Sequence, residues 1–188
     1  MAFTALLDAN VLYSAPLTDL LLRIAAVDVF RLKWSADIHD EWMGNLSANR
    51  PDLPHERIAR RCELMDQHAR DVLVEGYAPL IPSLTLPDPN DRHVLAAAIV
   101  GRVDLIVTYN RSDFPAAVVA PYGIDVQHPD EFLSYQFDLA PALILSVIRD
   151  LRAGLTRPPI SPDDYLNVLA RQGLPTLVAR LRPHVVDI

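Results

Sequence analysis

The sequence lacks the residues that several common classes of protein require. It contains one cysteine, Cys62, which excludes an internal disulfide framework and a zinc site built from cysteines. Its six glycines lie far apart, so neither a G-x-G-x-x-G nor a G-x-x-x-x-G-K-[ST] loop is present. The G-x-S-x-G and H-E-x-x-H motifs are missing as well. These absences exclude the glycine-rich phosphate-binding loops, the strand–turn–helix serine hydrolases and the metalloproteases of the H-E-x-x-H type.

Long hydrophobic runs are also missing. No apolar stretch approaches the roughly 18 residues that a membrane-spanning helix needs. The N-terminal residues MAFTALLDAN carry no basic region and reach an acid at Asp8, which argues against a signal peptide. We therefore expect a protein of the reducing cytoplasm with no membrane association.

Positive charge is scarce, and Lys33 is the only lysine. The chain has 17 Lys+Arg against 24 Asp+Glu, which gives a net charge of −7. A passive nucleic-acid-binding protein usually presents a broad basic face, which this composition does not favour. The acids predominate in residues 1–139, whereas residues 140–188 have a slight positive balance. A metal enzyme whose carboxylates are matched by bound cations fits the composition better.

The 188 residues, of which 51% are hydrophobic, suffice for one folded domain with an appendage. Short apolar segments alternate with amphipathic ones, a pattern that predicts βαβ units and a parallel sheet covered by helices. We therefore predict an α/β fold with a central parallel sheet of about five strands. The predicted strands are Phe3–Leu7, Val29–Leu32, Val72–Val74, Leu105–Val107 and Ile124–Val126.

Recognisable first residues mark several of the predicted helices. Ser35 and Ser161 are predicted N-caps, and Asp88 followed by proline predicts the start of a helix from Asn90 to Val100 that closes at Gly101. A further helix is predicted from about His55 to Arg70. Helices between the strands would cover both faces of the sheet.

Residues 138–188 contain no strand signal and are predicted to form a helical C-terminal extension to a domain of residues 1–137. The extension begins with a helix from Pro141 to Leu155 that carries a wide apolar stripe. Because isolated helices of that length are marginal in water, the stripe should pack on the α/β body. The extension then either lends basic surface for RNA or a partner, or only covers apolar surface.

Four acidic residues from separate parts of the chain are expected at one edge of the sheet. Asp8 follows the first strand, and Asp113 follows the strand at 105–107. Asp91 lies in the first turn of the helix that leads into that strand, and Glu41 lies in the helix after the second strand. In an open parallel sheet, ligands bind beyond the carboxyl ends of the strands. An oxygen-only cluster at that edge suits Mg²⁺ or Mn²⁺.

Each acid also has a purely structural explanation. Asp91 can serve as an acid in the first turn of its helix, Asp8 with Asn10 can form an Asx turn, and Asp113 can cap a short helix. Glu41 lies beside an apolar helix face, where an unpaired carboxylate is costly. The separate explanations do not account for the convergence of all four acids on one edge.

Four motifs in the same order and at the same spacings resemble those of the PIN-domain nucleases, and most of all the bacterial VapC-like ribonuclease toxins. The motifs are Leu6-Leu7-Asp8-Ala9-Asn10, Ser35-x-x-Ile38-x-x-Glu41, Asp91-x-x-x-Leu95-Ala-x-Ala98 and Val107-Thr108-x-Asn110-x-x-Asp113-Phe114. The resemblance covers residues 3 to about 133 and implies a three-layer PIN-like fold. It assigns no role to residues 138–188.

The resemblance implies metal-dependent hydrolysis of RNA, in which Mg²⁺ or Mn²⁺ lowers the pKa of a water and neutralises charge at the phosphate. It further implies a homodimer and a small antitoxin that covers the site. The implied metal-binding and catalytic residues are Asp8, Glu41, Asp91 and Asp113, supported by Asn10, Thr108 and Asn110.

Five arginines are weaker candidates for contacts with RNA. Arg57, Arg60 and Arg61 share one side of a predicted helix, while Arg92 and Arg111 lie next to predicted site residues. Their guanidinium groups could bind phosphates. A solvated helix face is the more common explanation for the first three.

Other functions stay open at this level. One is a housekeeping RNA-processing nuclease, and another is a PIN-like binding or assembly module that has lost its metal. A haloacid-dehalogenase-like phosphatase would also have an acid after the first strand. That enzyme needs a second Asp two residues after Asp8, where this chain has Asn10, and a downstream lysine, whereas the only lysine is Lys33.

Overall fold

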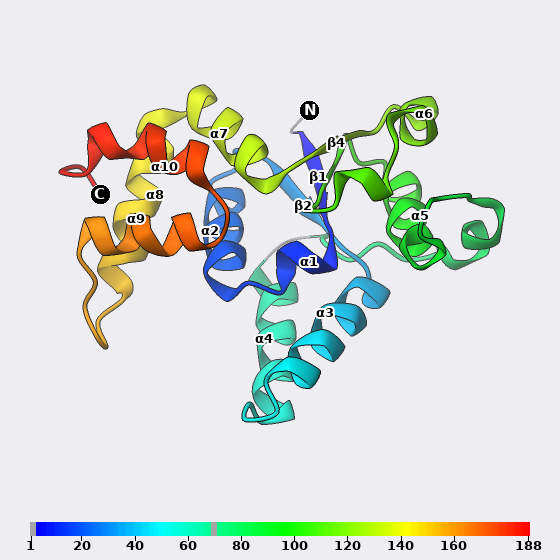
Figure 1. Ribbon diagram of the computed structural model, residues 1–188, viewed down its shortest axis with the longest axis horizontal. Helices are drawn as coiled ribbons and strands as arrows, with labels where there is room; N and C mark the ends of the chain where they lie inside the picture. The colour runs from blue at the N-terminus through cyan, green and yellow to red at the C-terminus, as the bar shows by residue number, and fades with distance from the viewer. Residues whose placement is uncertain (1–2, 69–70) are drawn as a thin grey trace.

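A four-stranded parallel sheet forms the centre of the α/β fold in the computed structural model, which describes residues 3–68 and 71–188 (Figure 1). The strand order is β2-β1-β3-β4, and every neighbouring pair is parallel. The strands are β1 (Thr4–Leu7), β2 (Arg31–Lys33), β3 (Leu105–Val107) and β4 (Asp125–Gln127). The central strands are fully apolar in their inner part because helices cover both faces of the sheet.

The expectation of about five strands was wrong by one within the described residues. Residues 72–74, predicted as a strand, form only an isolated bridge in which Leu73 pairs with Trp34. Trp34 donates its N–H to the carbonyl of Val72 at 3.0 Å, and Val74 donates to the carbonyl of Trp34 at 2.8 Å. The segment therefore lies beside the chain just after β2, but its pairing is too short to make a strand.

Helices connect the strands and account for most of the chain. They are α1 (Ala9–Leu12), α2 (Ala15–Ala26), α3 (Ala36–Asn49), α4 (His55–His68), α5 (Arg92–Val100), α6 (Ala116–Val119), α7 (Pro129–Leu139), α8 (Pro141–Gly154), α9 (Pro162–Arg171) and α10 (Pro175–Leu181). Short 3₁₀ turns are η1 (Ala78–Ser83), η2 (Pro89–Asp91), η3 (Arg111–Asp113), η4 (Ala120–Tyr122) and η5 (Arg182–His184). The predicted end of α4 at residues 69 and 70 lies outside the described residues.

Side-chain caps fix the starts of the helices near the sheet edge. The hydroxyl of Ser35 accepts the N–H of Ile38 at the start of α3, as predicted. Asp88 accepts the N–H of Asn90, but the turn that follows is the 3₁₀ turn η2. The α-helix α5 therefore begins at Arg92, two residues later than predicted.

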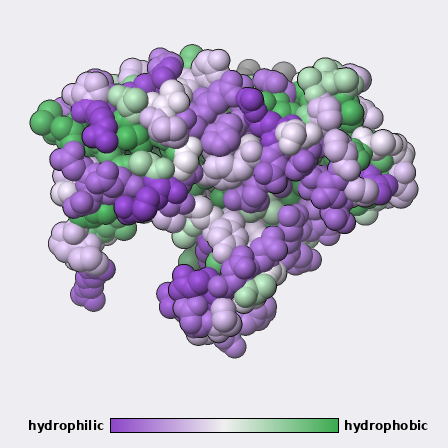
Figure 2. All heavy atoms as spheres, viewed as in Figure 1, coloured by the Kyte–Doolittle hydropathy of each residue, from purple (hydrophilic) through white to green (hydrophobic). Residues whose placement is uncertain are grey.

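The helices form groups on either side of the sheet. In Figure 1, α2 and α7–α10 lie on one side of the strands, and α5 and α6 lie on the other. The pair α3 and α4 projects from the body, and Figure 2 shows its surface covered mostly with hydrophilic residues. This arrangement leaves the carboxyl ends of the strands between α1, α3 and α5.

The C-terminal helices share a core with the body of the molecule. Helix α8 packs against α2 and α7, α9 packs against α2, and α10 packs against α7 and α9. The predicted stripe of α8 is buried at Ile144, Val147, Ile148 and Leu151, whereas Leu143 stays 40% exposed. Burying each large side chain contributes on the order of 1.5–3 kcal/mol, so these contacts fix the extension to the body.

No single helix in the described part of the chain is both long and apolar enough to cross a bilayer. Helices α7 and α8 reach the required length and composition only when they are taken together, across a bend of 116°.

Candidate active site

Asp8 lies at the carboxyl end of β1, where the chain turns into α1. Its side chain is buried, and its backbone N–H donates to the carbonyl of Val107 on the neighbouring strand at 3.1 Å. Oδ1 accepts the N–H of Ala9 at 2.7 Å, which makes Asp8 the N-cap of α1. The carboxylate is therefore held at the sheet edge by the start of the helix that follows it.

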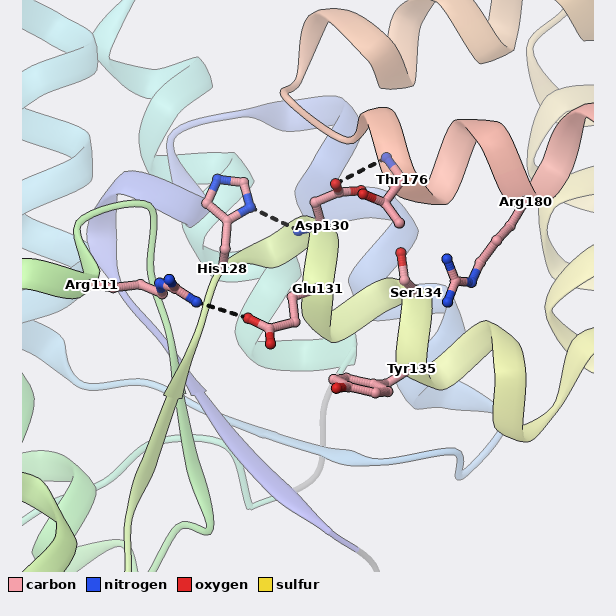
Figure 3. A pocket seen from close by; sticks show the side chains of 8 residues that line it. All are labelled: Arg111, His128, Asp130, Glu131, Ser134, Tyr135, Thr176 and Arg180. Atoms are coloured by element: carbon pink, nitrogen blue, oxygen red, sulfur yellow. Dashed lines mark hydrogen bonds and ion pairs between the residues drawn. The ribbon is translucent and has the colours of Figure 1, made fainter. Parts of the chain in front are cut away.

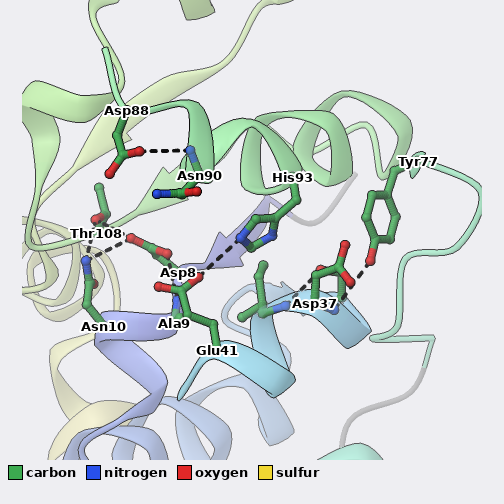
Figure 4. Close-up of polar contacts among 12 residues, drawn as sticks. Asp8, Ala9, Asn10, Asp37, Glu41, Tyr77, Asp88, Asn90, His93 and Thr108 are labelled. Carbon is green, nitrogen blue, oxygen red and sulfur yellow. Dashed lines mark hydrogen bonds and ion pairs between the residues drawn. The ribbon is translucent and has the colours of Figure 1, made fainter. Parts of the chain in front are cut away.

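Thr108 and Asn10 hold the other oxygen of Asp8 (Figure 4). The Thr108 hydroxyl donates to Oδ2 at 2.7 Å, and the Asn10 amide donates to the same oxygen at 2.8 Å. Asn10 also donates to the Thr108 hydroxyl at 3.0 Å, and its carbonyl oxygen accepts the N–H of Tyr109. These bonds tie the end of β1 to the end of β3 and fix the direction in which Asp8 points.

Asn110 takes part in this network through its backbone. Its N–H donates to the hydroxyl of Thr108 at 3.0 Å, while its side chain is exposed. The sequence predicted a supporting role for Asn110 without specifying which of its atoms acts. The contact seen here depends on the backbone position and not on the amide side chain.

Asp91 lies among the other three predicted acids. Burial raises the pKa of its carboxyl most, and the charges of Asp8, Asp113, Asp88 and Glu41 raise it further, to about 6. Like charges act on a pKa in this way only at short range, since the effect falls off with distance and solvent screening. The structure therefore brings the predicted acids together at the carboxyl ends of β1 and β3.

Burial raises the pKa of Asp8 as well. The charge of Glu41 adds to that effect, whereas the hydrogen bonds from Thr108 and Ala9 lower the pKa. Asp113 is the fourth acid of the group. It lies in η3, the turn that follows β3, and its side chain is half-buried. Each of the four acids thus belongs to a different segment, as the topology predicts for an edge site.

Glu41 is held by a histidine that the sequence interpretation did not assign to the site. Nε2 of His93 lies 3.2 Å from Oε2 of Glu41, and Nδ1 of His93 is buried without a partner. Burial alone would lower the pKa of His93, but the hydrogen bond and charge of Glu41, with Asp37 and Asp8, outweigh it and raise the pKa. The only signal in the sequence was that His93 follows Asp91 by two residues.

The donor set fits a hard divalent cation. Within residues 3–68 and 71–188, His93 supplies the only ion-pair partner of these four acids, through Glu41. No arginine or lysine there forms an ion pair with Asp8, Asp91 or Asp113. Several carboxylate oxygens without a basic counter-charge are the ligands that Mg²⁺ or Mn²⁺ prefers. Binding of a cation would remove the repulsion that raises the pKa of Asp91.

A second group of possible metal ligands lies between α3 and α4. His39, Cys62 and Asp66 each place a ligand atom within 4.8 Å of the others. The indole of Trp42 donates to Nδ1 of His39 at 2.8 Å, so the ring proton lies on Nε2 and faces Asp66 at 2.9 Å. Burial raises the pKa of the Cys62 thiol to about 11. A metal ion would therefore have to displace a proton from Nε2 of His39 and another from the thiol of Cys62 to bind at this cluster.

The five arginines predicted to contact RNA differ in exposure. Arg57 is exposed, Arg60 pairs with Glu63 at 3.0 Å, and Arg111 pairs with Glu131 at 3.0 Å. Arg92 is half-buried and donates from Nε to the carbonyl of Pro89. Contacts of these four with RNA stay predictions.

Arg61 differs from the other four arginines, because its guanidinium group faces the protein, and its contact with RNA also stays a prediction. It donates to the carbonyls of Leu12 and Tyr13 and to the hydroxyl of Thr18, and it lies 4.7 Å from the ring centroid of Trp42. Carbonyls at the end of a helix lack partners within the helix, and Arg61 satisfies those of α1. Three of its five N–H groups are therefore used within the protein, which leaves fewer of them for RNA.

Comparisons with known proteins agree with this fold. The family model described as "PIN domain" matches residues 4–112, and the one described as "VapC50 C-terminal domain" matches residues 129–183. The Mycobacterium tuberculosis protein named "Putative ribonuclease VapC50" is 38% identical over 107 residues. The aligned part covers 57% of this chain and 62% of that protein, so the chain spans less than two thirds of the length of this relative. No solved structure matches.

The PIN-domain match covers more than half of the chain and includes three of the four acids, Asp8, Glu41 and Asp91. It ends at residue 112, within the turn that carries Asp113. The parallel α/β sheet agrees with the PIN-like fold that the resemblance implied. The chain therefore belongs to the PIN-domain family.

Proposed function

We propose that this protein is a metal-dependent endoribonuclease that hydrolyses phosphodiester bonds of RNA at the edge of the sheet marked by Asp8. The observation that carries the proposal is the group of carboxylates, which forms no ion pair with an arginine or lysine in residues 3–68 and 71–188. Burial and the charges of the neighbouring acids raise the pKa of Asp91 in this group to about 6. Such a group destabilises the fold unless a cation neutralises it. A chain that keeps this group is suited to binding a divalent cation.

Asp8, Glu41, Asp91 and Asp113 would hold Mg²⁺ or Mn²⁺. When bound, such a cation acidifies water and neutralises the charge that develops on the phosphate. The chain contributes orientation: Thr108 and Asn10 hold Oδ2 of Asp8, and Nε2 of His93 holds Glu41. No side-chain nucleophile is needed for this chemistry.

RNA cleavage measured with Mg²⁺, with Mn²⁺ and with excess EDTA tests the proposal. We expect cleavage only with a divalent cation, and we expect Asp8→Asn to reduce it to background. Asp163→Asn is the matched control, since Asp163 is exposed in the first turn of α9. Full activity in EDTA contradicts the metal requirement.

A thermal unfolding measurement supplies a readout that does not depend on activity. We expect Mn²⁺ to raise the Tm of the wild type and of Asp163→Asn by much more than that of Asp8→Asn, because ligands that bind only the folded state stabilise it. A wild type that shows neither cleavage nor a Tm shift with Mn²⁺ or Mg²⁺ would instead be a metal-free binding module.

The biological role that we propose is that of a toxin in a type II toxin–antitoxin system. The 38% identical relative carries a ribonuclease name, which supports the activity but leaves the role open. A small antitoxin would cover the acidic site and place an arginine among the carboxylates, where a bidentate contact replaces the cation. The toxin would form homodimers.

Expression with and without a co-encoded small protein tests this role. We expect growth arrest when the chain is expressed alone, recovery when the small protein is present, and a dimer by light scattering. Normal growth together with active RNA cleavage favours the housekeeping nuclease. A monomer that binds no small protein removes the support for the toxin assignment.

We also propose the division into a nuclease domain of residues 1–137 and a helical extension of residues 138–188. The break falls in the last turn of α7, just before Pro141 starts α8. Since α8 and α9 pack against α2, the extension is expected to fold together with the nuclease domain.

A further inference from the structure

A cleft of about 440 Å³ opens where α7 meets α10, next to the turn η3 that carries Asp113. Three separate segments form it: η3, the first half of α7 with the residue before it, and α10 (Figure 3). The cleft is thus shared between the nuclease domain and the extension. The lining residues are Arg111, His128, Asp130, Glu131, Ser134, Tyr135, Thr176 and Arg180.

The cleft contains a buried hydroxyl group with no partner. Ser134 is only 4% exposed, and its Oγ makes no hydrogen bond in the structure. In Figure 3 this oxygen points into the space between Asp130 and Arg180. A buried polar group without a partner is costly, so a ligand atom at this point would recover a hydrogen bond that the protein alone does not make.

Nitrogen donors surround the same space. Arg111 uses Nη1 on Glu131, and Arg180 uses Nε and Nη2 on Asp138, which leaves other N–H groups of both side chains free. Nδ1 of His128 accepts the N–H of Asp130, so the proton of the neutral ring lies on Nε2. Burial and the charge of Arg111 lower the pKa of His128, which favours this neutral form.

The carboxylates in and near the cleft do not close it to an anionic ligand. Both oxygens of Asp130 are occupied at the start of α10, where they accept the N–H groups of Thr176 and Leu177 at 2.9 Å. Glu131 is 40% exposed and makes a single contact with Arg111, and exposed pairs of this kind are weak. A phosphate group can therefore replace Glu131 on Arg111, and it can take the N–H groups that Arg180 does not use on Asp138.

Tyr135 adds an aromatic surface to these polar groups. It is 52% exposed, and its ring lies along one side of the cleft in Figure 3. Bases of single-stranded RNA stack on exposed aromatic rings, whereas paired bases in a helix are not available for this contact. The cleft thus combines a stacking surface, cationic donors and a buried hydroxyl group.

We propose that this cleft binds one nucleotide of a single-stranded RNA substrate. The base stacks on Tyr135, and the phosphate or the base acceptors take hydrogen bonds from Arg111, Arg180 and Ser134. Because Arg180 belongs to α10, the C-terminal extension forms part of the RNA-binding surface. This inference rests on the proposed ribonuclease function and adds a substrate contact outside the carboxylate group.

Equilibrium binding of RNA in the Asp8→Asn background tests the cleft, since cleavage is then expected to be blocked. The probe is a fluorescein-labelled ten-nucleotide RNA of random sequence, measured by anisotropy at several salt concentrations. We expect Tyr135→Ala to weaken binding on the order of ten-fold, the size of a lost stacking contact. Arg180→Ala should weaken it as well and reduce the salt slope by about one phosphate contact.

Matched controls come from residues of similar exposure outside the cleft. Tyr122→Ala removes a ring that is 49% exposed, and Arg23→Ala removes an arginine that pairs with the exposed Asp19. Both should bind the RNA as the Asp8→Asn parent does. Ser134→Ala is a second cleft variant that is expected to keep its Tm, because it removes an oxygen with no partner, and to bind RNA a few-fold more weakly.

The outcomes separate the cleft from the proposed function. If the wild type cleaves RNA and all three cleft variants bind the probe as tightly as the parent, the cleft is not a nucleotide site and the ribonuclease proposal stands. A changed oligomeric state of Tyr135→Ala with unchanged RNA affinity assigns this surface to protein contacts and also overturns the inference. A wild type that neither binds nor cleaves RNA overturns both.

Discussion

Burial of Asp91, together with repulsion from the neighbouring carboxylates, makes the stability of the metal-free protein depend on pH. Asp91 has an ordinary pKa of 3.8 when unfolded and about 6 when folded, so the folded protein holds the proton more tightly. Between these values unfolding releases a proton, and stability therefore falls as the pH rises from about 4 through 6. Under the proposed function, a bound cation would offset this loss of stability.

Asp91→Asn should consequently raise the Tm in EDTA. The difference from the wild type should be small near pH 4 and reach its full size above about pH 6, where the wild-type carboxyl is ionised. Differential scanning fluorimetry across this range measures it. With saturating Mn²⁺ the order should reverse, because the wild type keeps a ligand that the variant lacks. A pH-independent difference in EDTA would contradict the raised pKa of Asp91.

Thr108 is the residue whose removal should disturb Asp8 most without touching its charge. The hydroxyl donates to Asp8 and accepts from the N–H of Asn110, so Thr108→Val leaves buried polar groups without a partner. We expect a loss of about 1–3 kcal/mol in the free energy of unfolding. Mn²⁺ affinity, measured by calorimetric titration, should fall about 10–100-fold, as for other residues that orient metal ligands.

Thr108→Ser is the control for this substitution, because it keeps the hydroxyl and removes only a methyl group. It should retain Mn²⁺ affinity within a few-fold of the wild type. If Thr108→Val and Thr108→Ser lost Mn²⁺ affinity to the same extent, packing of the side chain would matter here and the hydrogen bonds of the hydroxyl would not.

At the level of single residues, the sequence predicts where the acids lie in the fold, but it predicts much less well which way neighbouring side chains point. The acids Asp8, Asp91 and Asp113 follow elements that end or begin at one edge, so topology alone predicts where they lie. The direction of a long side chain depends on what packs beside it. Arg61 shares a helix side with Arg57, yet it turns inward because the end of α1 offers it unpaired carbonyls.

At the level of elements, capping residues predicted helix starts well and hydrophobic runs predicted strands less well. Ser35 and Ser161 cap α3 and α9 as expected, because the cap depends on residues within one turn. Whether residues 72–74 form a strand depends on how much partner backbone lies beside them. The segment after β2 pairs with residues 72–74 only at Trp34. The sequence of residues 72–74 does not show how long this pairing is.

The turn between α9 and α10 contacts the loop that carries the supporting residues of the site. The hydroxyl of Tyr109 donates to the carbonyl of Gln172 at 2.5 Å, and the hydroxyl of Ser14 donates to the side chain of Gln172 at 2.5 Å. Gly173 lies in the left-handed region with φ +75°, which places the turn close against the Tyr109 ring. The extension therefore contacts and supports the loop that contains Thr108 and Asn110.

Tyr109→Phe should release this contact. We expect a loss of about 0.5–1.5 kcal/mol in the free energy of unfolding, the net value of a neutral hydrogen bond. Amide hydrogen exchange should be faster in the loop of residues 108–110 and in the turn around Gln172. Tyr122→Phe is the control, because Tyr122 is exposed, and it should change neither measurement. Unchanged exchange in the loop of Tyr109→Phe would show that the extension does not support it.

At the scale of the whole molecule, the extension and the nuclease domain are expected to behave as one cooperative unit. Leu169 of α9 is fully buried, and α9 packs against α2, which itself belongs to the nuclease domain. Hydrogen bonds also join the two parts, since the carboxylate of Asp130 in α7 accepts the N–H groups of Thr176 and Leu177 at the start of α10. A shared apolar core of this kind couples unfolding of one part to unfolding of the other.

Urea unfolding of Leu169→Ala and of Leu20→Ala therefore tests whether the two parts are coupled. Leu20 is fully buried in α2, so each variant leaves a cavity and should lose about 2–5 kcal/mol in the free energy of unfolding. Because one core contains both residues, each variant should still show a single transition with an unchanged m-value, followed by tryptophan fluorescence and by circular dichroism. Trp34 and Trp42 both lie in the nuclease domain, so their fluorescence reports on that part alone. If Leu169→Ala shifted the circular dichroism transition and left the fluorescence transition in place, the extension would unfold separately and could not buttress the site.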